Sequence, residues 1–108
     1  MRRATWQQQV QRSSTHAELL RAIVQYLELT GWLVLITPKG GVPGLAGLPD
    51  LLAFKGARFL PVEIKAGYDK KRYEQVIMAA RLEAAGFPVL EARSLDDVIH
   101  ATRKEYSG

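Results

Sequence analysis

The sequence contains no cysteine, and its two histidines, His16 and His100, stand far apart. The lack of cysteine excludes a disulfide framework and a thiolate nucleophile, and two scattered histidines cannot form a zinc site by themselves. Each histidine reads as a surface or packing residue of a helix, and neither is assigned a role. No apolar run approaches the ~20 residues that cross a bilayer, and the N-terminal segment lacks the apolar stretch of a signal peptide. We therefore expect a cytoplasmic protein with no membrane partner.

Acidic residues are outnumbered by basic ones. Fifteen Lys and Arg against eleven Asp and Glu give a net charge of +4 and a pI near 9.6. A basic surface favours a polyanionic partner, because each cation that meets a phosphate releases condensed counterions. Charge alone does not separate a nucleic-acid-binding protein from an ordinary mildly basic one.

The hydrophobic pattern predicts one α/β domain over residues 14–108, preceded by a polar arm over residues 1–13. The expected order is α-β-β-β-α-β-α, and the last strand follows a helix crossover, so we expect a mixed sheet of about four strands flanked by helices. In the second helix, Tyr73, Val76, Ile77, Ala80 and Ala84 form one apolar face. The predicted segments are a helix from the capping box of Thr15 and Glu18 to Gly31, strands over 32–37, 51–54 and 59–65, a helix over 69–85, a strand over 88–92 and a helix beginning at Ser94.

The two middle strands form a hairpin that carries charged residues. Asp50 opens the first strand, and residues 55–58 make a tight connection into the second. Because strand side chains alternate, Glu63 and Lys65 share one face of the second strand. Antiparallel pairing can bring the carboxylate of Asp50 close to that of Glu63. The hairpin therefore predicts two acids and a lysine in one place.

Two neighbouring carboxylates suit a divalent cation. Mg²⁺ or Mn²⁺ prefers hard oxygen ligands, usually one or two carboxylates with water and phosphate oxygens. A bound metal lowers the pKa of a coordinated water and polarises a phosphoryl oxygen, as phosphodiester hydrolysis requires. Lys65 could orient that water or offset charge on the phosphate. The plainer alternative is that Glu63 and Lys65 form a strand-surface ion pair worth at most ~1 kcal/mol.

Basic residues flank this hairpin. The loop over residues 38–47 holds four glycines and two prolines, so its backbone N–H groups can approach a phosphate, although it has no P-loop motif. Lys39 in this loop favours contact with nucleic acid. Lys70, Lys71 and Arg72 fall in the first turn of the predicted helix, where they could dock a phosphate or form a solvated surface run.

The motifs Gly47-Leu48-Pro49-Asp50 and Glu63-Ile64-Lys65 resemble those of the PD-(D/E)xK nuclease superfamily. The order of elements is similar to that of its VRR-NUC (virus-type replication and repair nuclease) domain over nearly the whole chain. In that family a Ser or Thr often stands where this chain has Arg72, so Asp69 could cap the helix instead. Pro61 lacks an N–H and implies an edge or a gap in its strand. The resemblance implies that Asp50, Glu63 and the Ile64 carbonyl bind the metal, that Lys65 is catalytic, and that Glu18 and Gln75 are outer members of the site.

The resemblance implies a restriction-endonuclease-like core and a divalent-metal-dependent DNA endonuclease of DNA repair, acting in a bacterial or phage-infected cell. Small relatives are similar to resolvases that act as homodimers on branched DNA such as Holliday junctions. Val34, Ile36 or the last helix could then form the dimer interface. The alternative is a catalytically silent nuclease-fold subunit that binds DNA or assists another protein. From spacing alone, Glu18 is a capping residue and Gln75 a surface residue.

Overall fold

The structure is a computed structural model that describes residues 15–67 and 71–104. The predicted arm over residues 1–13 lies outside this range, as do Asp69 and Lys70. No helix in the described ranges has the length and apolar character needed to span a membrane. The order of elements is the predicted one: α2 (His16–Leu29), β1 (Leu33–Ile36), β2 (Leu51–Lys55), β3 (Arg58–Ile64), α3 (Tyr73–Ala84), β4 (Leu90–Ala92) and α4 (Leu95–Lys104).

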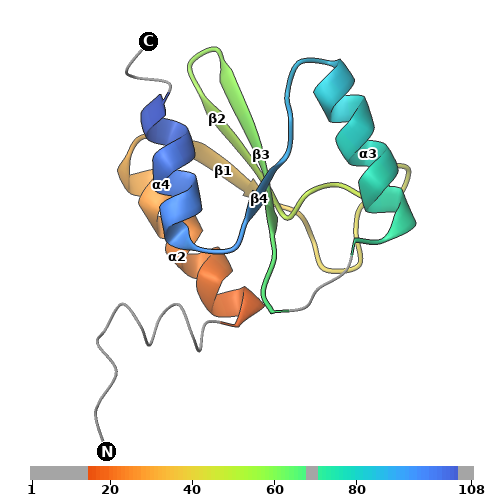
Figure 1. Ribbon diagram of the computed structural model, residues 1–108, viewed down its shortest axis with the longest axis horizontal. Coiled ribbons are helices and arrows are strands. Elements are labelled where there is room, and N and C mark those ends of the chain that lie inside the picture. Colours follow the sequence, from red (N-terminus) through yellow and green to blue (C-terminus); the bar gives the residue numbers. More distant parts are fainter. Residues whose placement is uncertain (1–14, 68–70, 105–108) are drawn as a thin grey trace, which may run out of the picture.

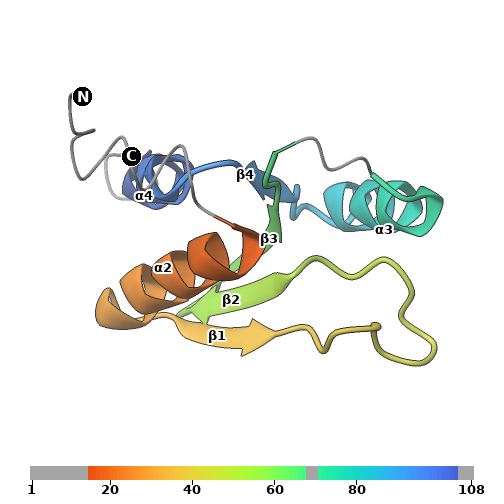
Figure 2. The same cartoon turned by 90° about the horizontal axis from the view of Figure 1, so that it is seen from below.

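The described strands form one mixed sheet in the order β1-β2-β3-β4. β1 and β2, and β2 and β3, pair antiparallel, whereas β3 and β4 are parallel. A parallel pair needs a crossover connection, and α3 lies within that crossover. Helices α2 and α4 lie on one side of the sheet and α3 on the other (Figures 1 and 2). This arrangement confirms the predicted restriction-endonuclease-like α/β fold.

The core lies between the sheet and helix α2. Leu19, Ile23 and Leu27 recur at a four-residue spacing and are buried, as expected for the inner stripe of an amphipathic helix. They pack in one cluster with Leu51 and Val62, which face each other across β2 and β3. The core therefore fixes α2 over the hairpin.

Strand β3 is buried along its second half, from Pro61 to Ile64. The β4 ladder begins at Val62, one residue after Pro61. The proline therefore lies where β3 has no partner on the β4 side, which agrees with the gap expected from its missing N–H.

Helix α3 differs from the prediction in its start and in its packed face. It begins at Tyr73 with Arg72 at the N-cap position, so Lys71 and Arg72 precede the helix and do not lie in its first turn. Tyr73, Val76 and Ile77 of the predicted apolar face are exposed, and Met78 is buried instead. The predicted apolar face was wrong as a packed face, because the side of α3 that approaches β3 is the one bearing Gln75, whose amide donates to Glu63.

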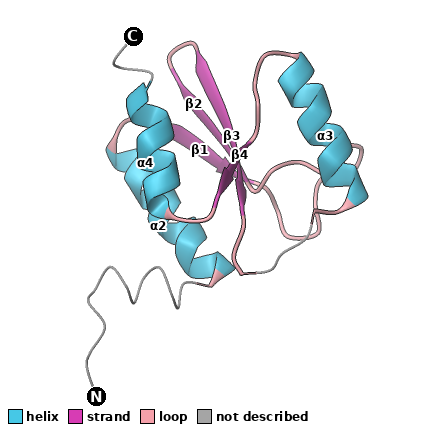
Figure 3. Cartoon of the chain, viewed as in Figure 1, coloured by secondary structure: helices cyan, strands magenta, loops and turns pink. Residues whose placement is uncertain are grey.

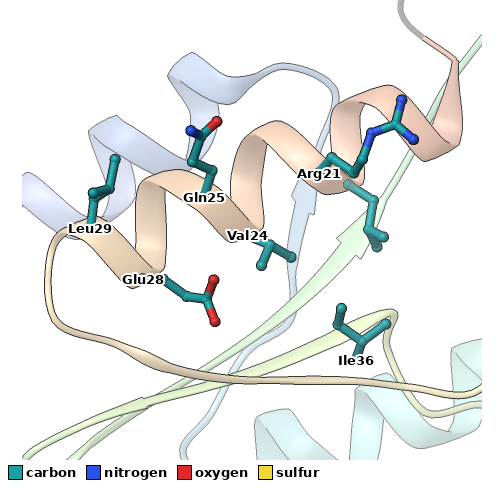
Figure 4. Close-up of a pocket in the computed structure, with 7 residues that line it drawn as sticks. Arg21, Val24, Gln25, Glu28, Leu29 and Ile36 are labelled. Atoms are coloured by element: carbon teal, nitrogen blue, oxygen red, sulfur yellow. The ribbon is translucent and has the colours of Figure 1, made fainter.

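A groove of about 510 Å³ runs between α2 and β1 (Figure 4). None of the predicted site residues lines it. Its lining residues are Leu20, Arg21, Val24, Gln25, Glu28, Leu29 and Ile36.

Candidate active site

The hairpin joins Asp50 and Glu63 through reciprocal hydrogen bonds between main chain and side chain. The N–H of Asp50 donates to Oε1 of Glu63 at 3.1 Å, and the N–H of Ile64 donates to Oδ2 of Asp50 at 2.8 Å. The pairing of Leu51 with Val62 places these groups at the same end of the two strands. The structure therefore brings the two acids together, with each carboxylate held against the other strand.

Lys65 completes a buried charged group. Glu63 and Lys65 are only 8% and 4% exposed, and Lys65 Nζ lies 3.9 Å from Glu63 Oε2. These burials contradict the strand-surface ion pair considered above. Burying charged groups costs free energy unless the groups are paired or bind a metal. The buried charges of Glu63 and Lys65 therefore mark a candidate functional site.

The surroundings of Glu63 raise the pKa of its carboxyl group. Burial, and next the negative charge of Asp50, raise the pKa of Glu63 from its ordinary value of 4.5 to about 7, while Lys65 acts in the opposite direction. A carboxyl with this pKa is partly protonated at neutral pH. A divalent cation beside both acids would relieve their repulsion and favour the charged form.

Gln75 reaches the site from α3. Its Nε2 donates to Oε2 of Glu63, and its Oε1 accepts a hydrogen bond from the N–H of Arg72 at 3.0 Å. One amide thus ties the start of α3 to β3. Spacing alone gave Gln75 as a surface residue, and only the family resemblance placed it near Glu63.

The glycine-rich loop positions α3. Gly47 has φ +83, and a Cβ atom there would lie 2.0 Å from the carbonyl oxygen of Glu74. The loop therefore passes directly against the first turn of the helix, beside which it runs in Figure 3. At the loop ends, the N–H of Thr37 donates to the carbonyl of Asp50 at 2.9 Å, and the Thr37 hydroxyl donates to the carbonyl of Pro49.

A small cavity of about 20 Å³ lies beside Glu63. Such a volume holds about one water molecule. Glu91 lies opposite Glu63 in the parallel β3–β4 ladder, and both line this cavity. The full lining is Gly47, Pro49, Glu63, Lys71, Gln75, Ala79, Val89 and Glu91.

Glu18 is not brought to the acids. It is exposed; its N–H donates to the Thr15 hydroxyl, and its Oε1 accepts from that hydroxyl. The first of these bonds is one half of the capping box predicted from spacing, and in the second the Glu18 carboxylate meets the Thr15 hydroxyl in place of the Thr15 N–H. Helix α2 contributes His16 instead, whose Nε2 lies 3.3 Å from Oδ2 of Asp50. Sequence reasoning had assigned His16 no role.

The predicted nucleic-acid-binding residues have different surroundings. Lys39 is exposed in the glycine-rich loop, and Arg72 is exposed at the N-cap of α3. Lys71 forms an ion pair with Glu91 of β4, which offsets part of its charge. Lys70 lies outside the described residues.

The donor set fits a hard cation with few protein ligands. In residues 15–67 and 71–104, no three His, Cys, Asp or Glu side chains are close enough to hold a metal ion. Asp50 and Glu63 are the two carboxylates that the hairpin joins, so water and substrate oxygens would complete the coordination. Mg²⁺ commonly binds proteins in this way.

A mixed sheet of this order, with an Asp and a Glu-x-Lys on one hairpin, defines the PD-(D/E)xK class of nuclease folds. Residues 10–83 match the model of the archaeal Holliday junction resolvase (Hjc) family, and the chain belongs to that family. The predicted superfamily is confirmed, whereas the narrower VRR-NUC assignment is not shown. Hjc resolvases are nucleases that act on branched DNA. No curated protein sequence matches the chain.

Proposed function

We propose that this protein is a divalent-metal-dependent endodeoxyribonuclease that hydrolyses phosphodiester bonds in branched DNA, including Holliday junctions. The observation that carries the proposal is the reciprocal pairing of Asp50 and Glu63 beside buried Lys65. Two acids joined in this way, with a raised pKa on Glu63, form a place where a cation is favoured.

Each site residue then has a role. Asp50 and Glu63, with the carbonyl of Ile64, would hold Mg²⁺ or Mn²⁺, which supplies charge stabilisation and an activated water when bound. The ammonium group of Lys65 offsets negative charge that develops on the phosphate. Gln75 keeps Glu63 in orientation through the hydrogen bond from its amide.

Exposed cations next to the site would bind the DNA backbone. Lys39 belongs to the loop that ends at Asp50, and Arg72 stands three residues before Gln75. Lys70 and Lys71 belong to the same segment as Arg72. Contacts of this kind are electrostatic, so binding should weaken steeply as salt rises.

We further propose that the active form is a homodimer. Resolution of a four-way junction needs two cuts, and the described part of the chain contains one acid pair. Leu33, Leu35 and Phe54 project from the sheet on the face opposite to the α2 core and are exposed, so a second copy could cover them. Val34 points to the core side, which argues against the interface expected there.

A cleavage assay on labelled four-way junction, flap, nicked and linear duplex DNA, with Mg²⁺ and with EDTA, tests this function. Cleavage should require the metal and favour branched substrates. Asp50→Asn keeps the shape of the side chain and removes its charge, so cleavage should fall by at least about 100-fold while junction binding persists. Unchanged cleavage by this variant would show that the site is elsewhere. Junction binding by the wild type without cleavage in Mg²⁺ or Mn²⁺ would instead indicate a silent accessory subunit.

A further inference from the structure

His16 is the residue of α2 that meets the acid pair. It is the first residue of the helix, 34 positions before Asp50 in the sequence, and its Nε2 lies 3.3 Å from Asp50 Oδ2. We propose that His16 is a positioning residue, which donates a hydrogen bond to Asp50 and holds that carboxylate in the orientation needed to bind the metal. This inference rests on the proposed nuclease function.

The direction of the hydrogen bond follows from the acceptor. An ionised carboxylate has no proton to donate, so Nε2 of His16 must carry the hydrogen in this contact. The N–H of Ile64 donates to the same Oδ2 atom at 2.8 Å. Asp50 is therefore held by one donor from β3 and one from α2, and both converge on one oxygen. A carboxylate side chain with a single donor could still rotate, whereas two donors from different elements restrict it.

The packing of α2 explains why His16 arrives there. His16, Leu19, Ile23 and Leu27 follow the spacing of one helical face, and the three leucine and isoleucine side chains are buried against the sheet. His16 extends this stripe by one turn, to the point where the helix leaves the core and meets the start of β2. The cap at Thr15 sets where the helix begins, and so fixes this position.

Glu18 provides the contrast on the same helix. Two residues rotate a helix by about 200°, so Glu18 points away from the stripe to which His16 belongs. It is exposed and contacts the cap residue Thr15. Of the two candidates on α2, the structure places His16 at the site.

The test compares three variants of His16 in the full chain. His16→Ala should weaken Mn²⁺ binding, measured by calorimetry, by about 10–100-fold, which is usual when the partner of a metal ligand is removed. In junction cleavage it should lower kcat and leave KM for DNA nearly unchanged. His16→Gln places an amide Nε2 near the position of the ring nitrogen and should restore most of the Mn²⁺ affinity. His16→Asn has a shorter side chain and should not restore it.

Thermal denaturation tests whether each variant is folded. Because the His16 side chain is 46% exposed, we expect little change in the melting temperature. Glu18→Gln provides the comparison with the other candidate on α2. Mn²⁺ affinity in Glu18→Gln that falls as far as in His16→Ala would overturn the inference, as would failure of His16→Gln to restore binding.

Asp50→Asn separates this inference from the proposed function. If Asp50→Asn loses Mn²⁺ while His16→Ala binds it as the wild type does, the metal site stands and the role of His16 is wrong. If neither the wild type nor Asp50→Asn shows saturable Mn²⁺ binding, the proposed function itself fails.

Discussion

The groups around Glu63 shift the pKa of its carboxyl group in opposite directions. Burial and the charge of Asp50 favour the protonated carboxyl, whereas Lys65 and the N–H of Asp50 favour the ionised form. The first two prevail, and the pKa rises to about 7. At the residue scale, and in the absence of metal, Glu63 of the folded chain therefore keeps its proton to a higher pH than Glu63 of the unfolded chain does.

This shift predicts how stability depends on pH. The native state binds the proton up to a pH of about 7 and the unfolded state only up to about 4.5. The contribution of Glu63 to stability is thus fully present below pH 4.5 and is lost as the pH rises through about 7. The free energy of unfolding of the metal-free protein should fall between pH 5 and 8 by roughly 1–3 kcal/mol from this group.

Urea denaturation in EDTA at a series of pH values measures this effect. Glu63→Gln cannot ionise, so its stability should vary less over the same range. The same decline in wild type and variant would assign the pH dependence to other groups.

The residues of the site differ in how far the sequence could reveal them. Asp50, Glu63 and Lys65 could be predicted to lie together, because strand alternation and a tight turn fix their relation within one hairpin. Gln75 and His16 reach the site only when two helices dock, and docking depends on tertiary contacts that no local pattern specifies. For His16, the only signal was its register with the buried stripe of α2.

At the scale of elements, α3 is placed by a close backbone approach. Its start, at Tyr73 and not at residue 69, and its packed face differ more from the sequence prediction than the bounds of the strands do. Apolar residues lie around much of this helix, so periodicity alone could not choose a face. Two tertiary contacts determine the packed face of α3 instead. They are the close approach of Gly47 to Glu74 and the hydrogen bond that Gln75 donates to Glu63.

Gly47→Ala tests that placement. The new Cβ would lie 2.0 Å from the Glu74 carbonyl oxygen, and a backbone atom cannot move aside without shifting the helix. We expect a loss of stability of roughly 2–4 kcal/mol from overpacking together with the positive φ, and weaker Mn²⁺ binding because Gln75 is displaced from Glu63.

Gly44→Ala is the matched control for this experiment. Gly44 has a similar φ of +82, but a Cβ there meets nothing within 4 Å. Its cost should be limited to the backbone conformation, about 1–2 kcal/mol, with Mn²⁺ binding retained. Equal losses of stability and of Mn²⁺ affinity in both variants would remove the case for the close approach.

At the scale of the whole molecule, no helix of residues 15–67 and 71–104 covers β1 on the face of the sheet opposite to α2. Leu33 is 62% exposed and Leu35 is 48% exposed, and burying such apolar neighbours against a second copy would be favourable. The double variant Leu33→Glu/Leu35→Glu should therefore be a monomer near 12.0 kDa, where the wild type should show twice that mass by light scattering. Its Mn²⁺ binding should persist, since the acids lie within one chain.

Leu29→Glu is the control for that experiment. Leu29 is 79% exposed at the end of α2, away from the Leu33 face, and its substitution should leave the mass unchanged. A monomeric wild type at micromolar concentration, or dissociation by Leu29→Glu alone, would contradict the proposed interface.

Asp50 and Glu63 stand 13 residues apart on one hairpin, whereas Gln75 and His16 arrive on helices from opposite sides of the sheet. Contacts this short in sequence form readily, without waiting for the rest of the chain. The pairing of the two acids should therefore survive changes in the docking of either helix, which would alter the neighbours of the acids and leave the hairpin itself intact.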